Sequence, residues 1–270
     1  MEFAALDVSL ADGIATIALD RPEQANALTL PMWHAIRQAM AWLDETADAR
    51  VGIITGHGKA FSAGIDLSLL AGVDALVADE CTGRSREKLR RLILDLQDTL
   101  TAIERCRKPV LAAIQGACVG GALDLICACD MRYCSDEAFF TIKEIDVGMT
   151  ADLGTLQRLP RLIGEGMTRE LAYTGRKVGG IEAQAIGLVN RCYPTGEALR
   201  DGVGEIARAV AAKSPLSIRG AKEMITYTRD HSIADGLNYV ATWNAAMLMS
   251  QDLTEAGRAA RERRAPAFRD

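Results

Sequence analysis

Strand and helix patterns alternate along this chain as far as Pro194, and this alternation limits the folds that it can adopt. Short apolar runs at Ile14–Leu19, residues 51–55 and Val110–Ile114 predict buried strands. Apolar side chains at helical spacing over residues 89–103 predict a helix between the second and third runs. Helices and strands that alternate in this way indicate an α/β fold.

Both ends of the chain add to this pattern. Residues 3–10 and Ile14–Leu19 flank a turn signal and predict a hairpin. Thr29 is placed to cap a helix that has Pro31 in its first turn and carries Trp33, Ile36, Met40 and Leu43 on one face. After Pro194 the strand patterns stop, and the sequence predicts a helical C-terminal quarter. Its expected helices span residues 197–213, 215–229, 232–249 and 253–264.

The charge balance excludes several classes of partner. The 31 basic and 36 acidic residues give a formal net charge of -5, and aromatic residues make up only 5% of the chain. Nucleic-acid binding requires a basic face and aromatic stacking platforms, so we expect no nucleic-acid partner. The longest uncharged apolar stretch, residues 110–123, contains three glycines and is shorter than a membrane span, so we expect no membrane partner.

The two ends and the cysteines favour the cytoplasm. Residues 1–5 have no basic region before an apolar core, and residues 267–270 do not end in the Ser-Lys-Leu peroxisomal address. The seven cysteines include no Cys-x-x-Cys pair and are expected to be reduced. The three histidines are scattered far from the cysteines, so we expect no metal site.

Two glycine-containing stretches, residues 61–67 and Gly120-Gly121, predict turns that present backbone N–H groups. The spacing of Gly116, Gly120 and Gly121 does not match the Gly-x-Gly-x-x-Gly dinucleotide fingerprint, which makes a nucleotide-binding dehydrogenase a weak alternative. Gly121 is expected to open a helix whose free N–H groups favour negative charge. Two such turns can supply the two donors of an oxyanion hole.

Residues 63–67 and 120–125 resemble the two signature stretches of the crotonase (enoyl-CoA hydratase/isomerase) superfamily. The resemblance also includes residues 21–28, 108–116 and 183–189. It implies an α/β crotonase-like spiral of repeated strand-strand-helix units. The expected division is a spiral core at residues 1–195 and a helical C-terminal oligomerisation region at residues 196–270.

The same resemblance implies a substrate and the groups that hold it. The thioester oxygen of an acyl-coenzyme A is expected to accept from the backbone N–H groups of Ile65 and Gly121, which form the oxyanion hole. Coenzyme A enters as part of the substrate, and no separate cofactor is expected. A homotrimer, or a homohexamer built as a dimer of trimers, is expected. The implied substrate-binding residues are Ala63, Gly64, Ile65, Asp66, Leu67 and Gly121.

Within this superfamily, residues 143–160 resemble the delta(3,5)-delta(2,4)-dienoyl-CoA isomerases, as do residues 229–232 and 239–244. In that subgroup the positions that match Asp124, Glu144 and Asp152 carry three active-site acids. Enoyl-CoA hydratases usually have Glu at the position of Asp124 and a glycine-rich loop around residue 152. Asp152 is therefore the residue that favours an isomerase.

The implied reaction shifts the double bonds of a 3,5-dienoyl-CoA to the 2,4 positions, within the β-oxidation of unsaturated fatty acids. A proton must leave C2 and another must arrive at C6, and two acids in different protonation states can do this. The resemblance implies that Asp152 is the base at C2 and Glu144 the acid at C6, although the two roles could be reversed. Asp124 is expected to tune or orient the pair.

Other interpretations stay open. A hydratase would use Asp124 and Glu144 to add water to a 2-enoyl-CoA, and a non-catalytic crotonase-like protein would only bind partners. Asp66 fits a helix cap better than a catalytic acid. His57 completes no Ser-His-Asp or Cys-His arrangement. The basic residues between Arg84 and Arg91 predict a solvated helix face rather than a phosphate site.

Overall fold

Nine strands form two sheets in the computed structural model, which describes residues 3–270. The larger sheet has the order β1-β2-β3-β4-β6-β9 and is parallel except for the β1–β2 pair. The smaller sheet has the order β5-β7-β8. The strands are β1 (Leu6–Ala11), β2 (Ile14–Leu19), β3 (Val51–Gly56), β4 (Val110–Ile114), β5 (Ala117–Val119), β6 (Met131–Ser135), β7 (Phe139–Thr141), β8 (Val178–Gly179) and β9 (Arg191–Tyr193).

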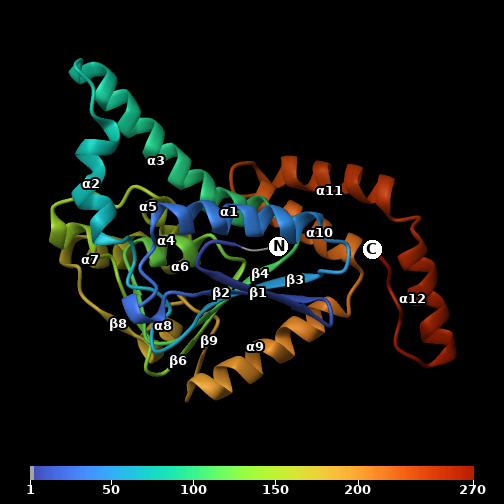
Figure 1. Ribbon diagram of the computed structural model, residues 1–270. Coiled ribbons are helices and arrows are strands. Elements are labelled where there is room, and N and C mark those ends of the chain that lie inside the picture. The colour runs from blue at the N-terminus through green and yellow to red at the C-terminus, as the bar shows by residue number, and fades with distance from the viewer. Residues whose placement is uncertain (1–2) are drawn as a thin grey trace.

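Helices connect and cover these strands (Figure 1). The predicted hairpin is confirmed, because β1 and β2 pair across a turn at Asp12 and Gly13. The helices are α1 (Leu30–Glu45), α2 (Leu67–Val77), α3 (Thr82–Arg105), α4 (Gly121–Cys127), α5 (Thr155–Arg158), α6 (Pro160–Ile163), α7 (Glu165–Thr174), α8 (Gly180–Ala185), α9 (Gly196–Ala211), α10 (Pro215–Tyr227), α11 (Ile233–Met247) and α12 (Gln251–Glu262), with short 3-10 turns at Pro22–Gln24 (η1) and Glu144–Val147 (η2).

Consecutive strands alternate between the two sheets in the middle of the chain. β4 lies in the larger sheet, β5 lies in the smaller one, and α4 follows them. β6 and β7 repeat this step before the run α5 to α7. The second strands of consecutive units lie side by side, as the β5–β7 pair shows. The expected α/β spiral of strand-strand-helix units is confirmed.

The two faces of the larger sheet are covered by different helices. Figure 1 shows α1 and α9 on opposite sides of the strands. The predicted face of α1 is buried at Trp33, Ile36, Met40 and Leu43, and Thr29 stands at its N-cap without a side-chain capping bond. On the other side, Leu199, Val203 and Ala207 of α9 pack with Val51, Leu111, Ala113, Tyr133 and Tyr193 of the sheet.

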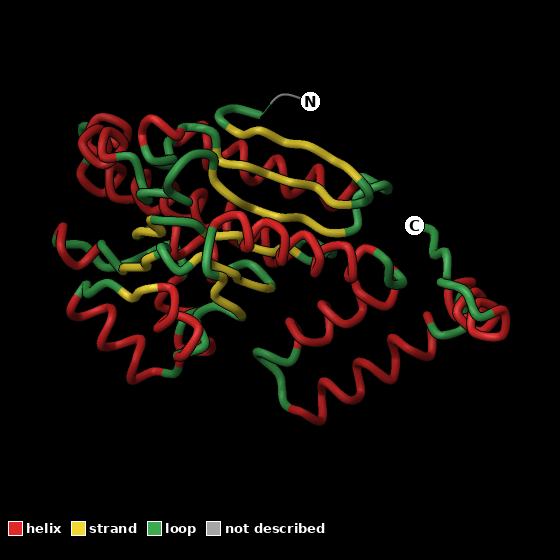
Figure 2. Tube along the Cα trace, turned by 90° about the horizontal axis from the view of Figure 1, so that it is seen from below, coloured by secondary structure: helices red, strands yellow, loops and turns green. Residues whose placement is uncertain are grey.

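The four predicted C-terminal helices are confirmed, and each of their ends lies within two residues of its predicted position. Figure 2 shows the last two, α11 and α12, standing apart from the sheets, whereas α9 lies against them. Ser214, Ser232 and Ser250 cap α10, α11 and α12 through their side chains. The division between residues 195 and 196 stays a prediction, and residues 1–2 of the expected core lie outside the described part of the chain.

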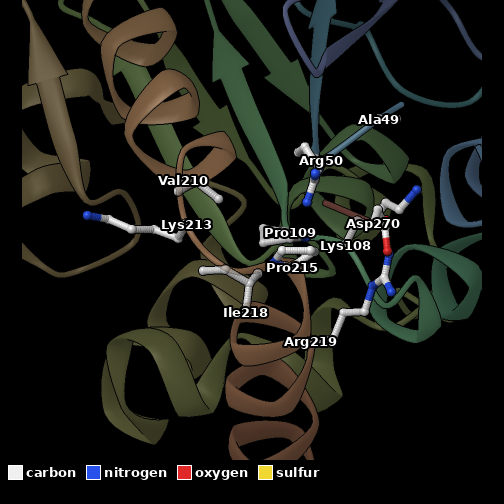
Figure 3. A pocket seen from close by; sticks show the side chains of 10 residues that line it. All are labelled: Ala49, Arg50, Lys108, Pro109, Val210, Lys213, Pro215, Ile218, Arg219 and Asp270. Carbon is white, nitrogen blue, oxygen red and sulfur yellow. The ribbon is translucent and has the colours of Figure 1, made fainter. Parts of the chain in front are cut away.

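The C-terminal tail returns to the amino ends of β3 and β4. Arg50 Nη2 donates to the carbonyl of Phe268 at 3.0 Å, and Arg219 pairs with Asp270. Figure 3 shows Asp270 next to Arg219 in the small pocket that also includes Lys108. Because parallel strands place their two ends at opposite edges of a sheet, this pocket lies at the edge opposite to the turn that follows β3.

The predicted helix over residues 89–103 is longer than its pattern, since α3 begins at Thr82. With α2 it projects from the rest of the fold (Figure 1), and no residue of α2 is buried. Within residues 3–270, none of the helices has the length and apolar character needed to span a membrane.

Candidate active site

The first of the two predicted turns presents the N–H of Ile65. Leu28 bridges this segment by donating to Gly64 O at 2.7 Å and accepting from Asp66 N at 3.0 Å. Neighbouring residues of an extended segment direct their N–H groups to opposite sides, so the N–H of Ile65 points away from Leu28. Among residues 3–270 it meets no acceptor.

Asn26 holds the loop that leads to Ile65. Its side chain is fully buried, and Nδ2 donates to the carbonyls of His57 and Ala60, both at 2.9 Å. Its own carbonyl accepts from Ser62 Oγ at 2.8 Å. Its φ of +54° lies in the left-handed region, which Asn tolerates better than most residues. This explains structurally why an Asn stands in the stretch 21–28.

The second turn presents the N–H of Gly121. Gly120 has a φ of +52°, and its own N–H donates to Thr141 O at 3.0 Å. Gly121 is the first residue of α4, so its N–H has no partner within the helix. No other acceptor in the described part of the chain reaches it.

The two turns pack against each other at Gly64 and Gly121. A Cβ on Gly64 would stand 2.3 Å from the carbonyl oxygen of Val119 and 3.3 Å from the amide nitrogen of Gly121. A Cβ on Gly121 would stand 3.7 Å from the amide nitrogen of Ile65 and 3.2 Å from Trp33 Cζ2. The structure therefore brings the two predicted donors together, because the absence of a side chain at Gly64 lets the two backbones pack against each other.

Three acids gather at the same turns. Glu144 begins η2, and its Oε1 lies 3.1 Å from the point where a Cβ on Gly120 would stand. Asp124 lies on the first turn of α4, where its side chain is buried and its Oδ1 accepts from Thr155 N at 2.5 Å. Asp152 is half-buried just before α5, and Gln97 Nε2 donates to its carbonyl at 2.6 Å.

Burial raises the pKa of each of these acids, and repulsion between the acids adds to the rise for Glu144 and Asp124. Burial, followed by the charge of Asp124, raises the pKa of Glu144 to about 7. Burial also raises the pKa of Asp124 to about 6, against the hydrogen bonds from Thr155, and Asp152 adds to the rise. The pKa of Asp152 is raised by burial as well. The buried Oε2 of Glu144 has no hydrogen-bond partner among residues 3–270, as suits a group that binds a substrate or a proton.

Asp66 has a structural position rather than a catalytic one. It caps α2 by accepting from Ser68 N at 3.0 Å, and its other oxygen accepts from Arg21 Nη1 at 2.9 Å. The hydrogen bonds from Ser68 and Arg21 lower its pKa to about 2. The cap interpretation is confirmed. Ala63 and Leu67 are exposed beside the first turn, and their predicted role in substrate binding stays a prediction.

The residues set aside in the sequence lie outside this site. His57 pairs with Asp7 at 3.0 Å on the surface. Of the basic residues on α3, Arg84 and Lys88 pair with Asp79, and Arg91 pairs with Glu87. All three cations are exposed, as a solvated face requires. In the described chain no group of three or more His, Cys, Asp or Glu side chains is arranged to share a metal ion.

Four supporting residues did not emerge from the sequence: Asn26, Trp33, Gln97 and Thr155. Trp33 was predicted only as a core residue of α1, yet its ring lies against Gly121. Gln97 reaches Asp152 from α3, 55 positions away in the sequence, and Thr155 reaches Asp124 across 31 positions. Asn26 and Thr155 carried a local signal, because they stand within the stretches 21–28 and 143–160.

Residues 9–270 match the family model described as enoyl-CoA hydratase/isomerase. The chain belongs to this family. One relative is the peroxisomal delta(3,5)-delta(2,4)-dienoyl-CoA isomerase of Arabidopsis thaliana. It is 47% identical to this chain over a region that covers 93% of this chain and 91% of the relative's length. The mitochondrial enzyme of that name from Homo sapiens is 43% identical over 91% of this chain and 75% of its own.

Solved structures support the same family fold. An enoyl-CoA hydratase from Bacillus anthracis superimposes with a TM-score of 0.89 at 32% identity, covering 98% of this chain and 99% of its own. The expected cytoplasmic location is wrong, since the relatives named above are peroxisomal and mitochondrial enzymes. That prediction relied on the absence of a secretory signal and of a Ser-Lys-Leu ending. Targeting signals are recognised by receptors and are independent of the fold.

Proposed function

We propose that this family member is a delta(3,5)-delta(2,4)-dienoyl-CoA isomerase. The observation that carries this proposal is the convergence of three protonatable acids, Asp124, Glu144 and Asp152, on two free backbone donors. The relatives of that name, at 43–47% identity, support the same reaction.

The donors of Ile65 and Gly121 would bind the thioester oxygen of the substrate. Removal of a proton from C2 leaves a dienolate whose negative charge collects on that oxygen. Two preorganised N–H groups stabilise it, and the amino end of α4 adds to the favourable field. The absence of side chains at Gly64 and Gly121 lets the two backbones lie close enough for both donors to reach one oxygen.

Two acids would then divide the proton transfers. Asp152, as the ionised base, takes the proton from C2, and Glu144, as the neutral acid, gives one to C6. A buried carboxyl whose pKa is about 7 keeps a proton at neutral pH, which suits Glu144 for donation. Asp124, held by Thr155 N, would orient the pair and tune it electrostatically.

The reaction needs no oxidant, reductant or added group. One proton leaves the substrate, another enters it, and two double bonds move by one position each. The carboxyls and the two N–H groups supply every step of this sequence. We therefore propose that coenzyme A is present only as part of the substrate and that no further cofactor acts.

A hydratase is the second candidate, because Asp124 and Glu144 alone could direct a water to a 2-enoyl-CoA. The test offers the purified protein both substrates and follows the ultraviolet spectrum. A 3,5-dienoyl-CoA should gain the absorption of a conjugated dienoyl thioester, while a 2-enoyl-CoA should change far more slowly. Rapid hydration of the 2-enoyl-CoA with no gain from the 3,5-dienoyl-CoA would overturn the isomerase assignment.

We also propose that the protein assembles as a homotrimer or a dimer of trimers through its C-terminal helices. Large apolar side chains lie exposed there, including Ile233 at 76%, Leu237 at 64% and Met249 at 91%. Such a patch on the end of a chain indicates a protein interface. Light scattering should give three or six copies, and Leu237→Glu should lower that number, while a monomeric wild type would contradict the proposal.

A further inference from the structure

One charged side chain fixes the segment that carries Asp152 without taking part in the proposed chemistry. Arg158, at the end of α5, turns back so that its Nη1 lies 3.4 Å from the carbonyl oxygen of Leu153. The same nitrogen stands 1.8 Å from where a Cβ on Gly154 would be. Gly154 has a φ of +131°, so a side chain there would be strained as well as blocked. The guanidinium therefore packs directly on the backbone at Gly154.

Arg158 is itself held by a network of charged side chains. Its Nη2 lies 2.7 Å from Glu104 Oε2, and both side chains are only 17% exposed. Glu104 also pairs with Arg229, which follows α10 and belongs to the 229–232 stretch that the proposed chemistry leaves unused. Burial works against ionisation of Glu104, but the two arginines outweigh it and lower its pKa. Charged hydrogen bonds of this kind fix geometry strongly.

Apolar packing holds the same segment from the other side, because Leu153 belongs to the hydrophobic core. A cavity of about 880 Å³ adjoins the segment and is lined by Leu153, Gly154 and Arg158, together with Glu104 and Arg229. The cavity thus lies beside the charged side chains, while residues 153–155 are buried. On the side of the cavity, the guanidinium of Arg158 is the group that packs on the backbone at Gly154.

The same segment controls two of the three acids. Asp152 precedes Gly154 by two residues, and Thr155, which follows it, donates the N–H that binds Asp124 Oδ1. A shift of the backbone at Gly154 would therefore move the proposed base and release the bond that orients Asp124. Misplacement of a reacting group by about 1 Å can lower a rate by about 100-fold.

We propose that Glu104, Arg158 and Arg229 form a positioning cluster that holds residues 152–155 in the geometry needed for proton transfer. This inference rests on the proposed acyl-CoA chemistry of the site. The three side chains act through Asp152 and Asp124 and touch no reacting carbon.

The test compares kcat and KM of R158M, R158K and E104Q with wild type, for whichever acyl-CoA reaction the wild type catalyses. R158M should lower kcat by about 100-fold and leave KM nearly unchanged, and R158K should restore part of kcat. Because the two residues act as one unit, R158M/E104Q should be no slower than R158M alone. R161M is the matched control, since Arg161 lies on the neighbouring α6 and pairs with the exposed Asp230.

Circular dichroism and thermal melting identify any variant that fails to fold. If R158M does not fold, the kcat values of R158K and E104Q decide the question. The inference is overturned if the folded variants keep the kcat of R161M, or if R158M raises KM and spares kcat. A wild type that is active on 2-enoyl-CoA but not on 3,5-dienoyl-CoA would overturn the proposed function and leave the kcat comparison valid.

Discussion

The amide nitrogen of Ile65 lies 3.7 Å from the point where a Cβ on Gly121 would stand. Residues more than fifty positions apart in the sequence thus place two backbone donors close together. The bridges from Leu28 to Ile65 and from Ser62 to Cys118 create this proximity, because they fasten the segment after β3 to Leu28 and to β5.

Gly121→Ala should therefore abolish most of the activity. The added methyl would meet Trp33 and stand over the Ile65 donor, where the thioester oxygen is proposed to bind. Loss of one oxyanion donor costs about 100- to 1,000-fold in rate, and we expect a fall of this order in kcat. Gly166→Ala on α7 is the control, since nothing lies within 4 Å of its added methyl. Equal activity of the two variants would refute the proposed oxyanion hole.

Asp152→Asn should stop isomerisation while leaving binding of the acyl-CoA intact. The amide has nearly the shape of the carboxylate but cannot take a proton from C2. Removal of a general base costs about 100- to 10,000-fold. Asp146→Asn is the matched control, because Asp146 is an exposed acid that pairs with Lys143 in the preceding turn. Full activity of Asp152→Asn would assign the base to another residue.

The pH profile of kcat/KM should be bell-shaped. Asp152 must be ionised, so the rate falls as pH drops through its raised pKa. Glu144 must be protonated, so the rate falls as pH rises through a pKa of about 7. Since the acids interact, the profile reports apparent values of the group. A rate that instead increases through pH 7 would show that Glu144 works in its ionised form and that the two roles are reversed.

Asp124→Asn should stabilise the fold at neutral and higher pH. Burial raises the pKa of Asp124 to about 6 in the folded state, above its value of 3.8 in a free chain. The favourable contribution of its proton is complete below pH 4 and is lost as pH rises to 6. At 1.36 kcal/mol per unit, the variant should gain up to about 3 kcal/mol over wild type across this range. Urea unfolding at pH 4 and pH 8 measures this, and an Asp124→Asn variant less stable than wild type at pH 8 would contradict it.

Local patterns predicted much of the fold. The sequence predicted β4 from the buried run Val110–Ile114, and it predicted α1 and α3 from their apolar faces. An element that is buried on one face has apolar residues at regular spacing, and this spacing can be detected in the sequence. The strands of the smaller sheet left no such record. β5, β7 and β8 have three residues or fewer, and a strand this short has no periodicity to detect.

The candidate site was predicted in part for a similar reason. Gly121, Ile65 and the three acids lie within contiguous stretches whose order resembles a known family. Arg158 and Gln97 were missed because their roles arise only when α3 and α5 pack beside the acids. Such contacts depend on tertiary structure and leave no spacing pattern along the chain.

The central claim is that one acid removes a proton from C2 and another delivers one to C6. It is tested most directly by converting a 3,5-dienoyl-CoA in D2O and locating deuterium in the product by NMR. The account predicts a conjugated 2,4-dienoyl-CoA that carries one deuteron at C6, donated by a solvent-exchanged Glu144. Unchanged substrate, a hydrated product, or a C6 proton carried over from C2 would contradict it.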